Sequence, residues 1–185
     1  MLKRTLMALT GVVLIWAGLT GPSNAATADI AALDITAINY NSYGADSVTN
    51  NTEYVEVKNT TADPVNVANL LVQDAWARGR DKTTGCNTFR LAPGALPVET
   101  GATADQLPAG AVLRLHMGKG TAGIDRSGVR HVYRSMPDVC GYHSNVFNNG
   151  PSGSNRWAAW DTAWITLGTG SKSKGYNFSF GYVAK

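Results

Sequence analysis

Three histidines and two aspartates are the residues of this chain whose types suit a metal ion. They are His116, His131 and His143, with Asp125 or Asp138 as added ligands, because imidazole and carboxylate groups are common metal ligands. The histidines are separated by 15 and 12 residues, intervals that match no ligand motif. The alternating pattern around His116 also predicts that its side chain points to solvent. We therefore interpret the histidines as scattered surface residues and expect no metal ion and no other cofactor.

A short glycine-rich stretch, Gly118-Lys119-Gly120-Thr121, invites comparison with a phosphate-binding loop. That loop requires a glycine five residues before the glycine of its Gly-Lys pair, and a serine or threonine directly after the lysine. Here Leu113 and Gly120 stand at those two places. The stretch is better explained as a turn that ends a strand, in which glycine supplies a positive φ angle. No nucleotide is expected as a partner.

Candidate nucleophiles and acids for an enzyme are few. A thiol nucleophile would be Cys86 or Cys140 with His131 or His143 as its base, but two cysteines are more typical of a disulfide if the chain is exported, as its first residues predict below. No serine lies in a G-x-S-x-G nucleophile elbow.

The sequence leaves open the possibility of two paired carboxylates that hydrolyse glycosides, with Asp74 and Asp161 as examples. Hydrogen bonding at turns and strand ends is sufficient to explain both, and a cross-strand pairing explains Glu56. We expect a protein that is not an enzyme. The alternative is a small exported hydrolase with a site between residues 78–86 and 150–160.

Two groups of basic residues are candidates for binding a polyanion: Arg78, Arg80 and Lys82, and then Arg126, Arg130, His131 and Arg134. Acidic residues close in sequence lower the net positive charge of both groups. We therefore interpret both groups as parts of solvated polar loops. If the two loops met in space, a patch for phosphate or polysaccharide would follow. The net charge of +3 falls to +1 if Lys3 and Arg4 are removed, so the composition gives no reason to expect a nucleic-acid partner.

Tryptophans near the end of the chain form the most unusual group. We propose a candidate binding surface of Arg156, Trp157, Trp160 and Trp164, since exposed aromatic rings stack on sugars or on partner surfaces. The alternative is that the rings pack as a satellite cluster over one sheet edge.

The first 25 residues have the organisation of a secretion signal. Lys3 and Arg4 precede an apolar run from Leu6 to Leu19, and small residues follow before Ala25. The run is too short and too rich in glycine for a permanent anchor. We expect cleavage after Ala25 or Ala28, a secreted, extracellular protein, and no integral membrane association afterwards.

The remaining chain has the length of one domain, with a short lead-in at 26–33 and a single domain at 34–185. Both cysteines lie in this exported part, and we expect a Cys86–Cys140 disulfide because the compartment is oxidising. In the loop-entropy description such a bridge contributes about 4 kcal/mol at most.

Short runs rich in Val, Ile, Leu, Tyr and Thr, separated by turn residues, predict strands throughout this domain. Alternation predicts that Val55 and Val57 point inward and Glu56 outward. The same argument places Leu113 and Leu115 inside. Further strands are expected at 35–40, 65–67, 70–72, 88–91, 129–136, 161–167 and 176–183, with a turn at Leu107-Pro108-Ala109-Gly110. These elements predict an all-β fold of the β-sandwich type.

Five segments in order resemble the lamin tail domain family. They are Tyr54-Val55-Glu56-Val57-Lys58-Asn59-Thr60, the run from Val65 to Asp74, the run from Leu107 to Gly120, Val146-Phe147-Asn148-Asn149, and Asp161-Thr162-Ala163 with Ile165. The chain is most similar to the secreted single-domain type of actinobacteria. The resemblance implies an immunoglobulin-like β-sandwich.

Three departures from the family pattern lie in loops. Phe147 stands where the family usually has tryptophan, Gly150–Trp160 is an insertion, and Gly79–Cys86 is a longer polar loop. We expect the insertion to carry the activity, because the fold does not require it. The sequence therefore favours a secreted, non-enzymatic binding module for a protein or a cell-envelope polysaccharide; a structural cell-envelope protein is a further alternative.

Overall fold

A computed structural model describes residues 29–39, 53–85, 87–134 and 160–177, without the side chains of residues 160, 161, 176 and 177. Its strands are β1 (Leu33–Asn39), β2 (Tyr54–Asn59), β3 (Val65–Asn66), β4 (Leu71–Gln73), β5 (Thr88–Arg90), β6 (Gln106–Leu107), β7 (Val112–His116), β8 (Gly123–Ile124), β9 (Arg130–Tyr133), β10 (Trp160–Leu167) and β11 (Gly170–Asn177). The helical elements in these ranges are two single turns, η1 (Ile30–Ala32) and α1 (Ala75–Arg78). The predicted all-β class is confirmed.

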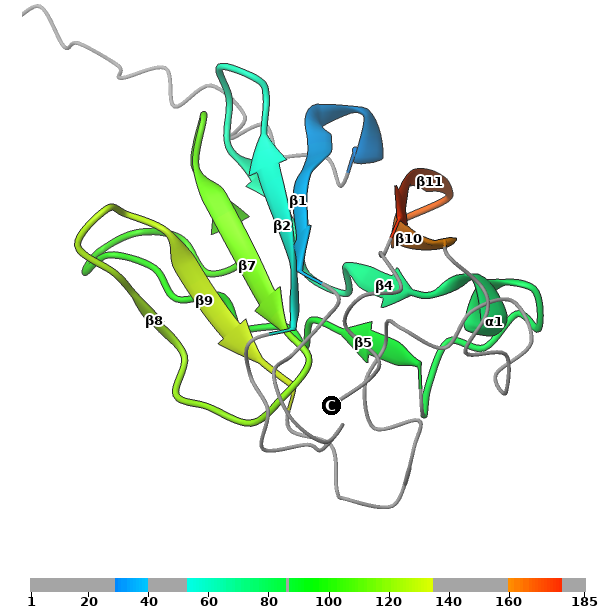
Figure 1. The fold of residues 1–185 in the computed structure, drawn as a ribbon. Helices are drawn as coiled ribbons and strands as arrows, with labels where there is room; N and C mark the ends of the chain where they lie inside the picture. The colour runs from blue at the N-terminus through cyan, green and yellow to red at the C-terminus, as the bar shows by residue number, and fades with distance from the viewer. Residues whose placement is uncertain (1–28, 40–52, 86, 135–159, 178–185) are drawn as a thin grey trace, which may run out of the picture.

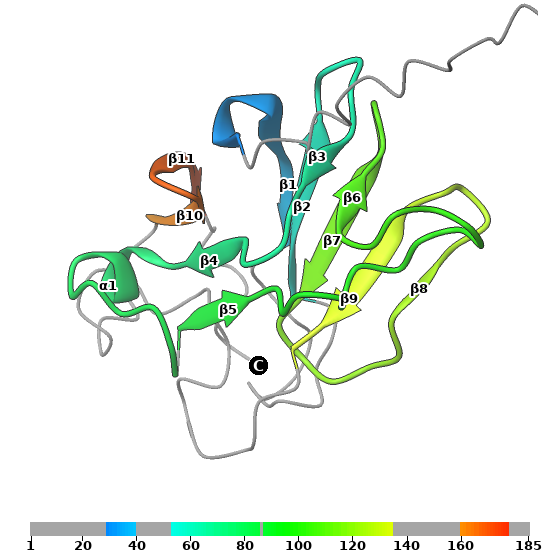
Figure 2. The ribbon, with the colours of Figure 1, turned by 180° about the vertical axis from the view of Figure 1, so that it is seen from behind.

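The strands form a five-stranded sheet in the order β1-β2-β7-β9-β8, a four-stranded sheet in the order β11-β10-β4-β5, and a small β3-β6 pair. Figures 1 and 2 show the two larger sheets from opposite sides, with α1 beside β4 and β10. The β7–β9 pair is parallel, whereas β2 is antiparallel to both of its neighbours, β1 and β7.

Alternation along the strands agrees with the predicted faces. Val55 and Val57 of β2 are fully buried, and Glu56 between them is only partly so. Ala163, Ile165 and Leu167 of β10 are likewise buried. Successive side chains of a strand point to opposite faces, so these residues define the inner face of each sheet.

One apolar core is shared by both large sheets. It joins inner-face residues of the first sheet, such as Leu113 and Leu115, with Val72, Phe89 and Ile165 of the second. Lys172 of β11 also donates hydrogen bonds to the carbonyl oxygens of Ala31 and Leu33, at 3.0 and 2.6 Å. The edge of the second sheet is thereby connected to the start of β1.

Strand β2 ends at Asn59, a polar residue inside the protein. It is fully buried, and its amide nitrogen donates to the carbonyl oxygens of Asp63, Leu107 and Pro108 at 2.8, 3.0 and 3.0 Å. These bonds satisfy a buried amide and hold two turns together. The second of them is the predicted Leu107–Gly110 turn, in which Gly110 has a φ of 67° and Ala111 N–H donates to the Pro108 carbonyl.

The last strand begins earlier than predicted. Residues 170–177 pair with β10 along its whole length, from Leu167↔Gly170 to Trp160↔Asn177. The predicted strand at 176–183 was therefore wrong in its start; residues 178–183 lie outside the described ranges. A two-residue loop connects β10 directly to β11 in a hairpin. Its first residue, Gly168, has a φ of 59°, as such tight loops require.

The Gly118–Thr121 stretch also differs from expectation. Neither Gly118 nor Gly120 has a positive φ. Instead, a Cβ atom placed on Gly120 would lie 2.4 Å from the Tyr133 ring. Glycine at position 120 thus allows close approach of the chain to an aromatic ring.

In the part of the chain that the structure describes, no helix has the length and apolarity needed to cross a membrane. The predicted signal peptide lies outside the described residues, as do Cys86 and Cys140, so the signal and the disulfide stay predictions.

Candidate functional site

A single helical turn, α1, presents two of the residues of the candidate site. Asp74 begins this turn: its carboxylate accepts a 2.6 Å hydrogen bond from Ala77 N–H and a 2.5 Å bond from the Asn87 side chain. A capping aspartate satisfies backbone donors that a helix leaves open at its start. Because Asp74 and Asn87 are both fully buried, the turn is fixed to the chain next to β5. The expectation that hydrogen bonding explains Asp74 is confirmed.

Trp76, in the middle of α1, has two cations beside its indole ring. The Arg80 guanidinium carbon lies 4.4 Å from the ring centroid, and the Lys82 ammonium lies 5.1 Å from it. Arg80 also donates to the Trp76 carbonyl oxygen at 3.3 Å. Both cations are exposed, and Trp76 is half-buried.

Arg78 connects the same turn to strand β10. Its guanidinium carbon lies 5.1 Å from the centroid of the Trp164 ring. Trp164 is half-buried on the face of β10 opposite the core residues, and it pairs in register with Gln73, just before α1. We call Trp76, Arg78, Arg80, Lys82 and Trp164 the cation–tryptophan surface.

This surface combines residues from two groups that were considered separately in the sequence: the first basic group and the predicted tryptophan surface. The first basic group supplies its cations, and Trp164 of the predicted binding surface supplies one of its rings. Arg156 and Trp157 lie outside the described residues. Trp160 begins β10, and its side chain is not described. Sequence reasoning missed Trp76, although its spacing from Arg78, Arg80 and Lys82, every second residue, was a visible signal.

The cations of this surface are held by rings rather than by acids. Within the described ranges, Arg78, Arg80 and Lys82 form no ion pair with a carboxylate. Exposed cation–π contacts contribute about 0.5–1 kcal/mol each. They orient the positive charges, with which no carboxylate of the described residues forms an ion pair.

The second basic group does not form an exposed patch. Arg130 and Arg134 are each only 3% exposed; Arg130 pairs with Glu99 at 2.7 Å, and Arg134 donates to the Gly85 carbonyl at 3.1 Å. Burial lowers the pKa of the Arg134 guanidinium, and the charge of Glu53 acts in the opposite direction. Their interpretation as solvated loop residues was wrong. Arg134 of the second group thus contacts the loop that follows the first group, at Gly85, through a partly buried hydrogen bond.

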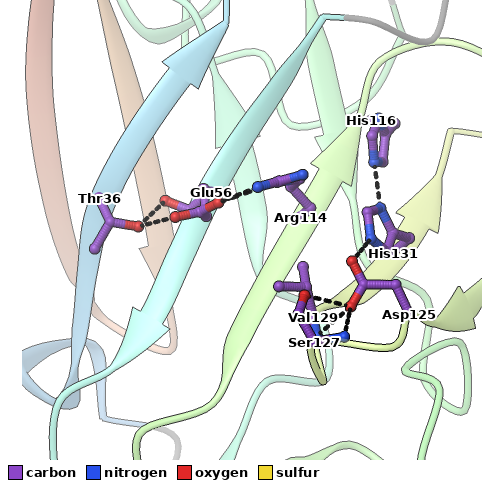
Figure 3. A network of polar contacts seen from close by, with 8 residues as sticks. All are labelled: Thr36, Glu56, Arg114, His116, Asp125, Ser127, Val129 and His131. Atoms are coloured by element: carbon purple, nitrogen blue, oxygen red, sulfur yellow. Dashed lines mark hydrogen bonds and ion pairs between the residues drawn. The ribbon is translucent and has the colours of Figure 1, made fainter.

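Two of the three histidines are in contact (Figure 3). His116 Nε2 lies 2.9 Å from His131 Nδ1, and His131 Nε2 lies 3.1 Å from an Asp125 carboxylate oxygen. His116 is only 7% exposed: it lies on the outer face of its strand, but its ring stacks on Tyr133 with centroids 4.4 Å apart. The interpretation of His116 and His131 as scattered surface residues was therefore wrong; His143 lies outside the described residues.

Asp125, His131 and His116 form a continuous chain of polar contacts. The tautomer of each ring decides which nitrogen donates: in the tautomer in which His131 Nε2–H donates to the Asp125 carboxylate, His131 Nδ1 accepts a hydrogen bond from His116 Nε2–H. Hydrogen bonds from Ser127 and then His131 hold the pKa of Asp125 well below its usual value. Among the described residues, no three His, Cys, Asp or Glu side chains gather where they could hold a metal ion.

A pocket of about 360 Å³ lies between the 83–85 loop, β5 and the end of β9. Its described lining includes Thr83, Thr88, Phe89, Tyr133 and Arg134, and contains no histidine or carboxylate. The described part of the predicted hydrolase site, residues 78–85, has Asp81 as its one acid. These surroundings offer no pair of acids for hydrolysis within the described residues.

Comparison with known proteins adds no assignment: no family model matches the chain, and a search of curated proteins finds no match.

Proposed function

We propose that this protein is an exported, non-enzymatic binding module, an immunoglobulin-like β-sandwich of lamin tail domain type. Two sheets on one core support the sandwich. Two of the segments behind the family resemblance are strand β2 with its buried Asn59 and the turn at 107–110, and both are ordered structural elements here. Export to the extracellular space is proposed from residues 1–25.

One observation carries the binding function: the cation–tryptophan surface. Three cations lie on an outer face without carboxylate partners in the described chain, and two of them lie beside one indole ring. Aromatic and arginine side chains are the residues that most often dominate the energy of a binding interface. The ligand is a partner protein or a cell-envelope polysaccharide.

The Asp125–His131–His116 chain is the observation that would favour an enzyme. It resembles the base and orienting acid of a nucleophilic catalyst. The inner end of this chain is His116, which is 7% exposed and whose ring packs against Tyr133. We therefore assign this chain to the structure of the β7–β9 region and keep the binding module as the proposed function.

The test is retention on a cell-envelope preparation. Trp76→Ala removes the ring beside Arg80 and Lys82, and Tyr54→Ala is the matched control because Tyr54 has Arg114 at 4.7 Å from its ring on the other sheet. We expect Trp76→Ala to reduce retention at least tenfold and Tyr54→Ala to leave it within twofold. Equal losses in both variants would contradict the assignment of binding to this surface.

The proposed contribution of the insertion is tested separately. Residues 150–159 lie outside the described ranges, and the predicted surface included Arg156, Trp157 and Trp160. Deleting Pro151 to Ala158 should leave the melting temperature nearly unchanged and reduce retention. A folded deletion variant with full retention would assign binding to the cation–tryptophan surface alone.

A further inference from the structure

We infer that the ligand of the cation–tryptophan surface is an acidic polysaccharide, whose carboxylate or phosphate groups contact Arg78, Arg80 and Lys82 while its sugar rings lie along Trp76 and Trp164. This inference rests on the proposed binding function and adds the chemical class of the ligand.

The charge of the surface is the first reason. Residues 78–82 contain three cations and one acid, Asp81. The nearest other carboxylate in sequence, Asp74, is buried, with its oxygens accepting from Ala77 and Asn87. It therefore lies beneath the surface and does not meet a ligand. The outward charge of this face is positive, and an anionic ligand would be attracted to it.

The position of the cations relative to the indoles is the second reason. Arg78 and Arg80 lie over tryptophan rings at 5.1 and 4.4 Å, so the guanidinium groups are already oriented before a ligand arrives. Arginine binds a carboxylate or phosphate through two parallel hydrogen bonds, and preorganisation reduces the ordering cost of binding. A neutral sugar would gain little from these oriented charges.

The ring surfaces favour a sugar polymer over an acidic peptide. Trp76 and Trp164 are both half-buried; Arg80 and Lys82 lie beside the Trp76 ring, and Arg78 lies beside the Trp164 ring. An acidic polysaccharide carries its charges directly on rings whose C–H faces can pack on aromatic groups, whereas acidic peptides carry them on flexible stems. The pocket described above lies between β5 and β9, and its lining includes none of these five residues.

The experiment measures binding of the purified protein to three probes by isothermal titration: polygalacturonate, its fully methyl-esterified form, and poly-L-glutamate. The site variant combines Arg78→Gln, Arg80→Gln and Lys82→Gln. The control variant combines Lys58→Gln, Arg90→Gln and Arg126→Gln, which removes the same charge from exposed positions elsewhere. Arg80→Gln alone, at an exposed residue, provides a variant whose folding is not in question.

We expect polygalacturonate to bind and its methyl ester to bind at least tenfold more weakly. The site variant should lose at least tenfold in affinity, Arg80→Gln about threefold, and the control variant less than twofold. Added salt should weaken binding of the unmodified protein more than binding of the site variant, since fewer ion contacts are screened in the variant.

Three results would overturn the inference: equal binding of the methyl ester, equal loss in the control variant, or poly-L-glutamate binding as tightly as polygalacturonate. The experiments distinguish a wrong ligand class from a wrong binding function. If Trp76→Ala abolishes envelope retention but polygalacturonate does not bind, the binding function stands and the ligand class is wrong.

Discussion

Arg78 and Trp164 are 86 positions apart in the chain, yet the guanidinium carbon of one lies 5.1 Å from the ring centroid of the other. The contact joins the outer end of α1 to the outer face of β10. It makes one surface from a basic loop and a tryptophan that belong to different parts of the sequence.

We expect this pair to be coupled energetically. A double-mutant cycle with Arg78→Ala and Trp164→Ala should give a coupling of about 0.5–1 kcal/mol in the free energy of unfolding, as for other exposed cation–π contacts. Urea denaturation followed by circular dichroism measures it. The matched cycle of Arg126→Ala with Trp164→Ala should give no coupling, because no contact joins that pair; the same coupling in both cycles would argue against a direct Arg78–Trp164 interaction.

Core and outer-face substitutions on β2 and β7 should differ sharply. Val57→Asp or Leu115→Asp places an unpaired charge in a fully buried position, which should abolish folding. Glu56→Gln and Arg114→Gln alter an ion pair of 2.9 Å whose side chains are 16% and 30% exposed, and each should cost under about 1 kcal/mol. Thermal unfolding measures both sets, and the reverse order of sensitivity would mean that the strand faces are assigned wrongly.

The Asp125 network should make stability depend on pH in the acid range. Hydrogen bonds from Ser127 and His131 lower the pKa of Asp125 in the folded state. A carboxyl whose pKa is lowered by folding stabilises the protein above its unfolded pKa, about 3.9, and loses that contribution as pH falls. The stability difference between the protein and Asp125→Asn should therefore shrink between pH 6 and pH 2. Urea unfolding at several pH values measures it; a difference that stays constant or grows with acid would show that Asp125 contributes no such linkage.

Gly120 should tolerate no side chain. Gly120→Ala places a methyl group 2.4 Å from the Tyr133 ring and should destabilise the protein by about 1–3 kcal/mol. Gly123→Ala is the control, because no atom lies within 4 Å of its added Cβ. Adding Tyr133→Ala to Gly120→Ala should remove the clash, so the two substitutions should not be additive in thermal unfolding. Strict additivity would indicate that Gly120 is required for another reason.

Much of the fold was determined by local pattern. Alternation along β2, β7 and β10 placed Val57, Leu115 and Ile165 on inner faces, where they are buried, because side chains of a strand must point to opposite sides. The turn at 107–110 was predictable for a similar reason, since proline and glycine restrict the backbone locally. The start of β11 was missed because its Gly-Ser-Lys composition is a weak strand signal.

The site depended on information that no local pattern contains. His116 lies on the outer face, as alternation predicts, but the register Tyr54↔His116 and His116↔Tyr133 places a ring on each side of it. Its burial follows from sheet order, which distant segments determine. The same holds for Arg78 and Trp164: the sequence by itself determined a basic loop and an outward-facing tryptophan, and only the tertiary structure decided that they meet. The physical reason is that strand pairing and helix packing depend on burying one shared core, whereas the chemistry of a surface depends on which outer faces that packing makes adjacent.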